Sequence, residues 1–114
     1  MNEKWCIINI MSIDYKFKES EVLKELQAYI DFTYDSHYSK SKHQAMEFID
    51  ECGHGEGFCM GNILKYAQRY GRKDGHNKAD LMKILHYGVI MLHIHGEKYE
   101  IDKEIGRASC RERV

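Results

Sequence analysis

The chain of 114 residues contains no proline, and this absence constrains its fold more than any other feature. Proline interrupts helices, so a chain without it permits long continuous ones. Lys, Glu and Met, which favour helix, are frequent. The composition therefore predicts a mainly α fold, a compact bundle of about four helices. Residues 5–11 (WCIINIM) fit either a short N-terminal strand or the first turn of a buried helix.

Hydrophobic spacing and capping residues predict where these helices begin and end. The expected ranges are 20–35, 44–51, 58–70 and 77–95. Ser20 and Asn77 are the expected N-terminal caps of the first and fourth helices, because their side-chain oxygens accept from free backbone amides. Gly53, Gly71 and Gly96 are the expected stops, since glycine readily adopts the left-handed conformation. Residues 35–43 are predicted to form a polar loop, and residues 53–57 an exposed, mobile turn.

The length predicts one domain over residues 1–103, small enough that a homo-oligomer is expected. The formal net charge is −1, so long nucleic acid is not an expected partner and an anion must be bound by a local cluster of cations. Four irregularly spaced cysteines predict reduced thiols and a cytoplasmic location. The longest apolar run, around residues 89–94, is far shorter than the ~20 residues that span a bilayer, so no membrane association is predicted.

The last eleven residues, 104–114 (EIGRASCRERV), read as the in-frame translation of a common sequencing adapter. One codon choice for them contains the adapter sequence continuously. We interpret them as an assembly artefact, the alternative being a basic, disordered tail. Cys110 and the three arginines of this segment are therefore left out of the predicted site.

A cationic face is predicted on the third helix. Asn62, Lys65, Arg69 and Arg72 follow one another at i, i+3, i+7 and i+10, and Lys73 comes next in the chain. Guanidinium forks and ammonium groups at this spacing suit phosphate binding. The alternative is a solvated helix face whose cations interact favourably with the C-terminal end of the helix dipole.

Two further groups of residues extend this predicted site. Asp80, Lys83 and Tyr87 lie at i, i+3 and i+7 on the fourth helix and would face the third helix in an antiparallel pair. Asp80 would orient an arginine, Lys83 would contact phosphate and Tyr87 would stack on a base. His37 and Tyr38, in the predicted polar loop, would supply a proton-transfer group and a stacking ring, and Glu47 a carboxylate for a sugar or base edge.

Other ligand-binding patterns are weak or absent. Cys52, His54 and Cys59 lack the paired CxxC spacing of a zinc site, so no metal centre is predicted. Neither GxxxxGK[ST] nor GxGxxG occurs, which excludes the phosphate-loop and dinucleotide-binding motifs.

These residues resemble the SaV-like phage family, small proteins labelled nucleotide kinases that lack a phosphate loop. The matching pattern spans residues 37–92, and its central block is GFxxGNxxKYxxRxGRKxG, from Gly57 to Gly75. The resemblance implies a phage protein of the bacterial cytoplasm that binds a nucleoside monophosphate or related nucleotide. The implied nucleotide-binding residues are His37, Tyr38, Glu47, Asn62, Lys65, Arg69, Arg72, Lys73, Asp80, Lys83 and Tyr87.

Three functions stay open at this point. A kinase would need Mg²⁺, for which Asp74 and Asp80 are the only candidate ligands in the predicted site. A non-catalytic sponge would sequester cyclic nucleotides or other nucleotide-derived immune signals and so block antiphage defence. A protein-interaction module would bind no nucleotide.

Overall fold

The computed structural model describes residues 13–100, and for residues 37–40 it describes the backbone alone. Four helices account for most of this part of the chain, and the described residues contain no strand: α1 (Glu19–Asp35), α2 (His37–Glu51), α3 (Gly55–Arg69) and α4 (Lys78–Tyr99). The prediction of a mainly α fold with about four helices is confirmed. The possible strand at residues 5–11 and the tail at 104–114 lie outside the described residues.

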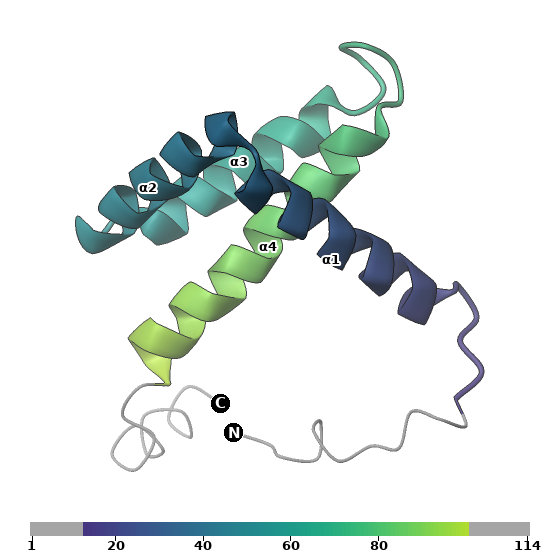
Figure 1. Ribbon diagram of the computed structural model, residues 1–114, viewed down its shortest axis with the longest axis horizontal. Coiled ribbons are helices and arrows are strands. Elements are labelled where there is room, and N and C mark those ends of the chain that lie inside the picture. Colours follow the sequence, from purple (N-terminus) through teal and green to yellow (C-terminus); the bar gives the residue numbers. More distant parts are fainter. Residues whose placement is uncertain (1–12, 101–114) are drawn as a thin grey trace.

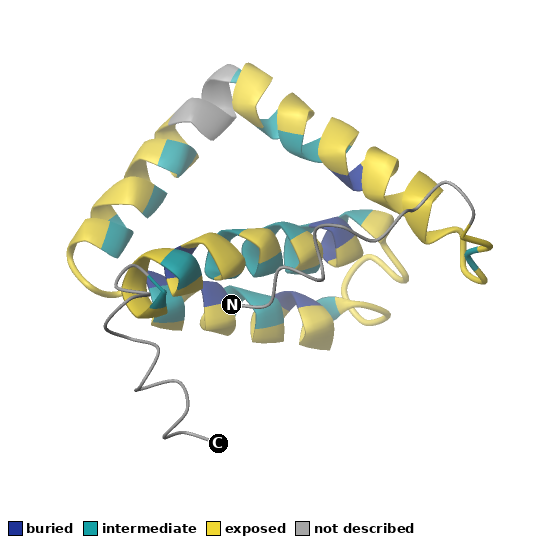
Figure 2. Ribbon diagram, turned by 90° about the horizontal axis from the view of Figure 1, so that it is seen from below, coloured by how far each residue is buried: buried dark blue, intermediate teal, exposed yellow. Residues whose placement is uncertain are grey.

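An antiparallel pair formed by α3 and α4 lies at the centre of the fold, with α1 packed on α4 and α2 on α3. Figure 1 shows α1 crossing α4, and Figure 2 shows α1 and α2 arching over one side of the pair. Few apolar side chains are fully enclosed. Those buried among the described residues are Leu26, Cys59, Tyr66, Met82 and Ile94. No helix in the described part of the chain is long and apolar enough to cross a membrane.

Three predicted cap and stop residues behave as expected. The Asn77 side chain caps α4 by accepting a 2.9 Å hydrogen bond from the Ala79 amide. Gly53 and Gly71 follow the ends of α2 and α3 with φ of 88° and 85°, a conformation that glycine adopts without a steric penalty. The capping and stop residues therefore account for three of the helix ends.

The start of α1 and the end of α4 differ from the prediction. Ser20 is inside the first turn of α1 and is not its cap; Lys18 holds that position, with a left-handed φ of 56°. Gly96 does not stop α4, which continues to Tyr99. The added turn carries Lys98 and Tyr99, whose side chains both donate to the Glu56 carboxylate on α3. Contacts with the neighbouring helix thus extend α4 beyond a residue of low helix propensity.

The predicted loop at residues 35–43 is wrong, because only Ser36 separates α1 from α2, which begins at His37. One of its polar residues, His43, packs on Tyr34 of α1 and lies near His86 of α4, and these contacts favour the helix. The predicted mobile turn at residues 53–57 is also shorter than expected. Gly55 already belongs to α3 and is buried, so that a Cβ there would lie 2.5 Å from Oδ1 of Asp50 and 3.0 Å from Cδ1 of Ile94. This glycine permits close helix packing rather than chain mobility.

Candidate anion-binding site

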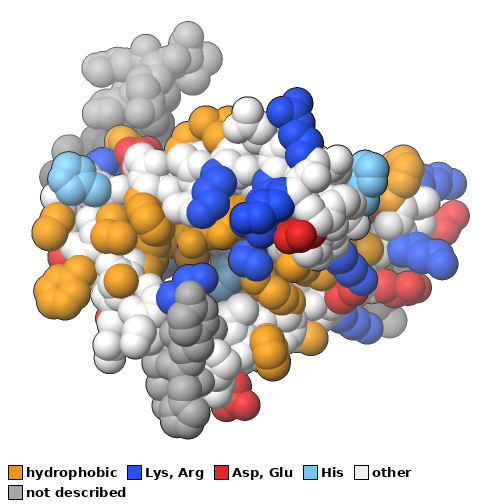
Figure 3. All heavy atoms as spheres, turned by 90° about the horizontal axis from the view of Figure 1, so that it is seen from above, with side chains coloured by type: hydrophobic (Ala, Val, Ile, Leu, Met, Phe, Trp, Pro, Cys, Tyr) orange, Lys and Arg blue, Asp and Glu red, His pale blue; other side chains and the backbone are white. Residues whose placement is uncertain are grey.

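Three cationic side chains converge on the ring of Tyr66, a buried residue at the α3–α4 contact. The Nζ atoms of Lys65 and Lys83 lie 4.9 Å and 5.6 Å from the ring centroid, and Cζ of Arg69 lies 5.8 Å from it. We call Lys65, Arg69 and Lys83 the cation cluster. Lys65 and Arg69 come from one side of α3, whereas Lys83 comes from α4. Figure 3 shows Lys and Arg side chains gathered next to hydrophobic ones in the middle of one face of the molecule.

Arg69 is the member of the cation cluster that carboxylates hold in place. Its Nε lies 3.6 Å from Oδ1 of Asp80, whose side chain is only 4% exposed, and its Nη2 lies 3.7 Å from Oδ2 of the exposed Asp74. Arg69 Nε and Asp80 Oδ2 are buried and have no hydrogen-bond partner among the described residues. The two side chains therefore form an ion pair in which Arg69 Nε can still donate, and Asp80 Oδ2 can still accept, a hydrogen bond.

Lys65 and Lys83 keep their charge uncompensated. Within the described part of the chain, neither ammonium forms an ion pair with a carboxylate. A Tyr66 ring face attracts cations through its quadrupole but carries no net charge. Asp74 and Asp80 offset the charge of Arg69, so the two ammonium groups are the source of a local positive field, to which a ligand with several anionic oxygens would bind.

Aromatic side chains continue the site along α4. The ring of Tyr87 is nearly parallel to that of Tyr66, with an interplanar angle of 12° and centroids 6.4 Å apart, and Phe58 meets Tyr87 edge-on at 6.1 Å. Burial raises the pKa of Tyr87 above its ordinary value. Tyr87 is therefore a neutral, half-buried ring close to the cation cluster.

Two histidines, His43 and His86, make ring contacts that join α1, α2 and α4. The His43 ring of α2 stacks on Tyr34 of α1 with centroids 3.9 Å apart, and lies 5.9 Å from His86 of α4. Tyr29 of α1 meets His86 edge-on at 6.1 Å. Burial is the main cause that lowers the pKa of both histidines, and the pKa is lowered further by the Lys42 charge for His43 and by the electrostatic interaction with His43 for His86. Both rings are therefore uncharged at neutral pH.

The structure brings together only some of the residues predicted for the site. Asp80, Lys83 and Tyr87 face α3 as expected, through Arg69 and Tyr66. Asn62 lies on the same side of α3 as Lys65 and Arg69, but its Nδ2 donates 2.9 Å to the Phe58 carbonyl of its own helix. This amide is thus partly used within α3.

The remaining predicted residues lie elsewhere. Arg72 and Lys73 were predicted to continue the α3 face, but α3 ends at Arg69, and both are exposed in the turn that precedes α4. No hydrogen bond or ion pair joins the exposed Glu47 of α2 to the cation cluster among the described residues. His37 and Tyr38 form the first turn of α2, and their side chains lie outside what the structure describes. The sequence prediction placed the end of α3 too late and missed the start of α2. These two errors account for the positions of Arg72, Lys73, His37 and Tyr38.

Sequence reasoning missed the residues at the centre of the site. It gave no role in the site to Tyr66, His43 or His86. The spacing of Lys65, Tyr66 and Arg69 contained part of the signal, because Arg69 is four residues from Lys65 and three from Tyr66, and side chains at these spacings are neighbours on a helix. The histidine contacts join three separate helices, so no local pattern indicates them.

The carboxylates considered for Mg²⁺ do not fit that ion. Asp74 and Asp80 both pair with Arg69, so one oxygen of each already faces a cation. Mg²⁺ prefers an octahedral shell of oxygens, and a guanidinium between the two carboxylates is incompatible with it. Among the described residues, no group of three or more His, Cys, Asp or Glu side chains is placed to hold a metal. In particular, Cys52 is exposed whereas Cys59 is fully buried.

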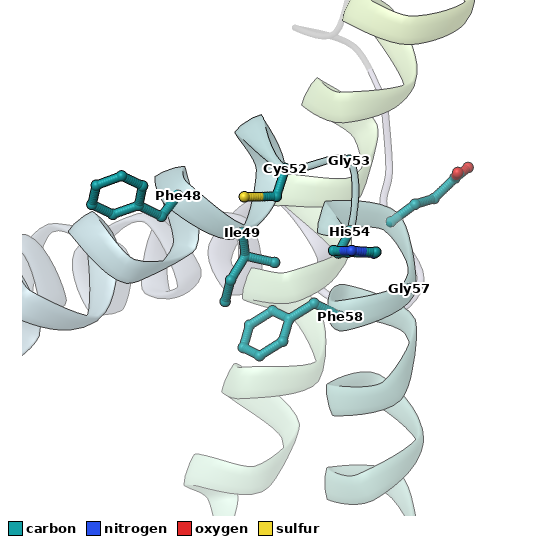
Figure 4. A pocket seen from close by; sticks show the side chains of 8 residues that line it. Phe48, Ile49, Cys52, Gly53, His54, Gly57 and Phe58 are labelled. Atoms are coloured by element: carbon teal, nitrogen blue, oxygen red, sulfur yellow. The ribbon is translucent and has the colours of Figure 1, made fainter.

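A separate pocket of about 720 Å³ lies at the elbow between α2 and α3. Figure 4 shows Phe48 and Ile49 at the end of α2 and Phe58 near the start of α3, with Cys52 and His54 around the connecting turn. Its lining is mainly apolar and includes no member of the cation cluster. This pocket therefore does not offer the charges that a phosphate-bearing ligand needs.

Comparison with known proteins gives one match. The sequence profile of a family described as a protein of unknown function, DUF3310, matches residues 32–88. These residues run from the end of α1 into α4 and include every member of the cation cluster. No curated protein and no solved structure matches the chain.

Proposed function

Since the chain belongs to the DUF3310 family, whose function is not known, we propose a function from its geometry: it binds a small phosphate-bearing ligand, a nucleotide, at the cation cluster. The observation that carries the proposal is the convergence of Lys65, Arg69 and Lys83 on Tyr66. Following the resemblance to the SaV-like phage family, we place this activity in the cytoplasm of an infected bacterium.

Charge and exposure support phosphate as the recognised group. Lys65 is exposed and Lys83 is half-buried, so both ammonium groups are reachable from solvent. Arg69 is 30% exposed, and its position is set by Asp80. A phosphate seated against this cluster would gain charge-assisted hydrogen bonds from up to three side chains without displacing an ion pair of either lysine.

The aromatic side chains near the cluster suit a base. Tyr87 lies beside Tyr66 and presents a half-buried ring, and aromatic rings stack on bases of any sequence. Tyr38, at the start of α2, is a second proposed stacking residue, and Asn62 a proposed orienting amide. We include His37, Glu47, Arg72 and Lys73 in the proposal only through the family resemblance.

Retention of the nucleotide without turnover is the preferred form of this proposal. Phosphoryl transfer uses Mg²⁺ held by carboxylates, and both candidate carboxylates are paired with Arg69. A protein that sequesters a nucleotide or cyclic-nucleotide signal needs affinity and no metal. The pairing of Asp74 and Asp80 therefore favours a sponge over a kinase.

The test is calorimetric titration with nucleosides, nucleoside mono-, di- and triphosphates and cyclic dinucleotides, with and without Mg²⁺. We expect phosphate-bearing ligands to bind, the matching nucleosides to bind far more weakly, and the ligand released on denaturation to be unaltered by chromatography. Equal affinity for a nucleoside and its phosphate would refute the assignment to the cation cluster. Conversion of a monophosphate to a diphosphate would establish the kinase instead.

A further inference from the structure

The face of the α3–α4 pair that α1 and α2 leave uncovered is apolar. Along it, side chains recur at alternating steps of 3 and 4 residues on both helices. We call these residues the apolar seam: Gly57, Met60, Leu64 and Ala67 on α3, and Leu81, Leu85, Gly88 and Leu92 on α4. This spacing is the a and d pattern by which helices pack into bundles.

The large side chains of the apolar seam are exposed in the single chain. Leu64 and Leu92 expose 63% and 74% of their surface, and Met60, Leu81 and Leu85 between 40% and 46%. On α4, His86 faces α1 through Tyr29, and the seam residues lie roughly a third of a turn or more away from it. The arch of α1 and α2 therefore covers the opposite side of the pair (Figure 2).

The apolar seam contains two glycines, Gly57 on α3 and Gly88 on α4. The buried contacts of Gly55 with Ile94 and of Arg69 with Asp80 set the antiparallel register of the two helices. This register places Gly57 level with Leu92, and Leu64 level with Leu85. A Cβ added at Gly57 or Gly88 would meet nothing within 4 Å, so nothing in the single chain requires glycine there. Glycine inside a helix is unfavourable, and close approach of another helix is a physical reason for it.

The apolar seam carries no charge. Its flanking residues Ile63, Ile84 and Val89 are also apolar, whereas Lys65 and Lys83 point to the Tyr66 side of the pair. At its ends, the charged residues Lys78 and Glu56 are paired within the chain, with Glu25 and Lys98. A nucleic acid or a charged peptide would find no complementary group here. A second identical face would match it, since two such faces bring together the same a and d rows and no like charges.

We infer that the apolar seam binds a second copy of this chain, forming a two-fold dimer whose centre is a four-helix bundle of α3 and α4 from each copy. The enclosed core of one chain is small, and such a dimer would enclose five further large side chains on each copy. The two cation clusters then lie on the outer sides of the bundle. The inference does not depend on nucleotide binding.

Light scattering after size-exclusion chromatography tests the dimer. We expect the unmodified protein to be a dimer in the tens-of-micromolar range and Leu64→Lys to be a monomer with unchanged helix content by circular dichroism. The matched control is Phe32→Lys, which places the same charge at a 70% exposed aromatic residue of α1 and leaves the dimer intact. A monomeric unmodified protein, or a Leu64→Lys variant that stays dimeric, would overturn the inference.

A second variant covers the case in which Leu64→Lys fails to fold. Leu85→Ala raises helix propensity and removes only atoms of a side chain that is 44% exposed in the single chain. Truncation near the centre of an interface weakens binding, and we expect the dimer dissociation constant to rise about tenfold or more. An unchanged dissociation constant would show that Leu85 lies outside the interface and would reject the four-helix bundle.

Discussion

The Asp80 carboxylate lies 3.6 Å from the guanidinium Nε of Arg69, and this contact joins the start of α4 to the end of α3. The Asp80 side chain is 4% exposed and that of Arg69 is 30% exposed, so the negative partner is buried and the positive one reaches solvent. A buried carboxylate that holds a reachable guanidinium both ties two helices together and aims a phosphate-binding group.

Asp80→Ala should lower the free energy of unfolding by about 1–3 kcal/mol, because it leaves a partly buried guanidinium without its inner carboxylate. Urea denaturation followed by circular dichroism measures the change. The control is Asp74→Asn, since Asp74 pairs with the same arginine, its side chain is 62% exposed, and asparagine tolerates the left-handed φ of 62° at this position. We expect less than about 1 kcal/mol for the control. Equal losses in the two variants would mean that burial does not distinguish these ion pairs.

Lys83→Gln should weaken binding of a nucleotide about tenfold or more, because a hydrogen bond to a charged group is lost. Calorimetric titration measures this change in affinity. Lys98→Gln removes the same charge from α4, but Lys98 pairs with Glu56 near the far end of the helix, and its affinity should stay unchanged. The affinity of the unmodified protein should also fall as salt is raised, since the contact is electrostatic. A similar loss in both variants would point to net charge rather than to the cation cluster.

Stability should fall as the pH drops below about 6.5. Burial lowers the pKa of His43 and His86 in the folded protein, so the unfolded chain takes up protons first. The neutral histidines therefore contribute stability at pH values above their pKa in the unfolded chain. This contribution is lost as the pH falls from that value through their lower pKa values in the folded protein. Melting temperatures between pH 7.5 and 5 measure this, and His86→Gln should flatten the dependence. An unmodified protein whose melting temperature does not fall in this window would contradict the buried, neutral histidines.

Gly55→Ala should destabilise the fold by about 1–3 kcal/mol, because the added methyl would overlap the side chains of Asp50 and Ile94. The control is Gly96→Ala, in the interior of α4, where an added Cβ meets nothing within 4 Å. There, alanine should stabilise the helix by about 0.5–1 kcal/mol. Thermal unfolding of both variants decides whether α2, α3 and α4 pack as closely as described.

Local signals in the sequence determined the helical class and several helix ends of this protein. The absence of proline, the Asn77 cap and the glycines after α2 and α3 act within a few residues of the chain. The i, i+3 and i+7 spacing also predicted that Asp80, Lys83 and Tyr87 face α3. These predictions succeeded because helix geometry alone decides which side chains share a face.

Only the tertiary structure decided the features that depend on contacts between helices. His43 packs on Tyr34 and near His86, and this is why a polar segment expected to be a loop is helical. Glu56 holds the last turn of α4 through Lys98 and Tyr99, which carries that helix past Gly96. The Tyr66 ring contacts cations from two helices, and the same packing shields the Asp80 side chain from solvent. The energies of these contacts come from residues far apart in the chain, whereas helix propensity and residue spacing depend only on near neighbours in the sequence.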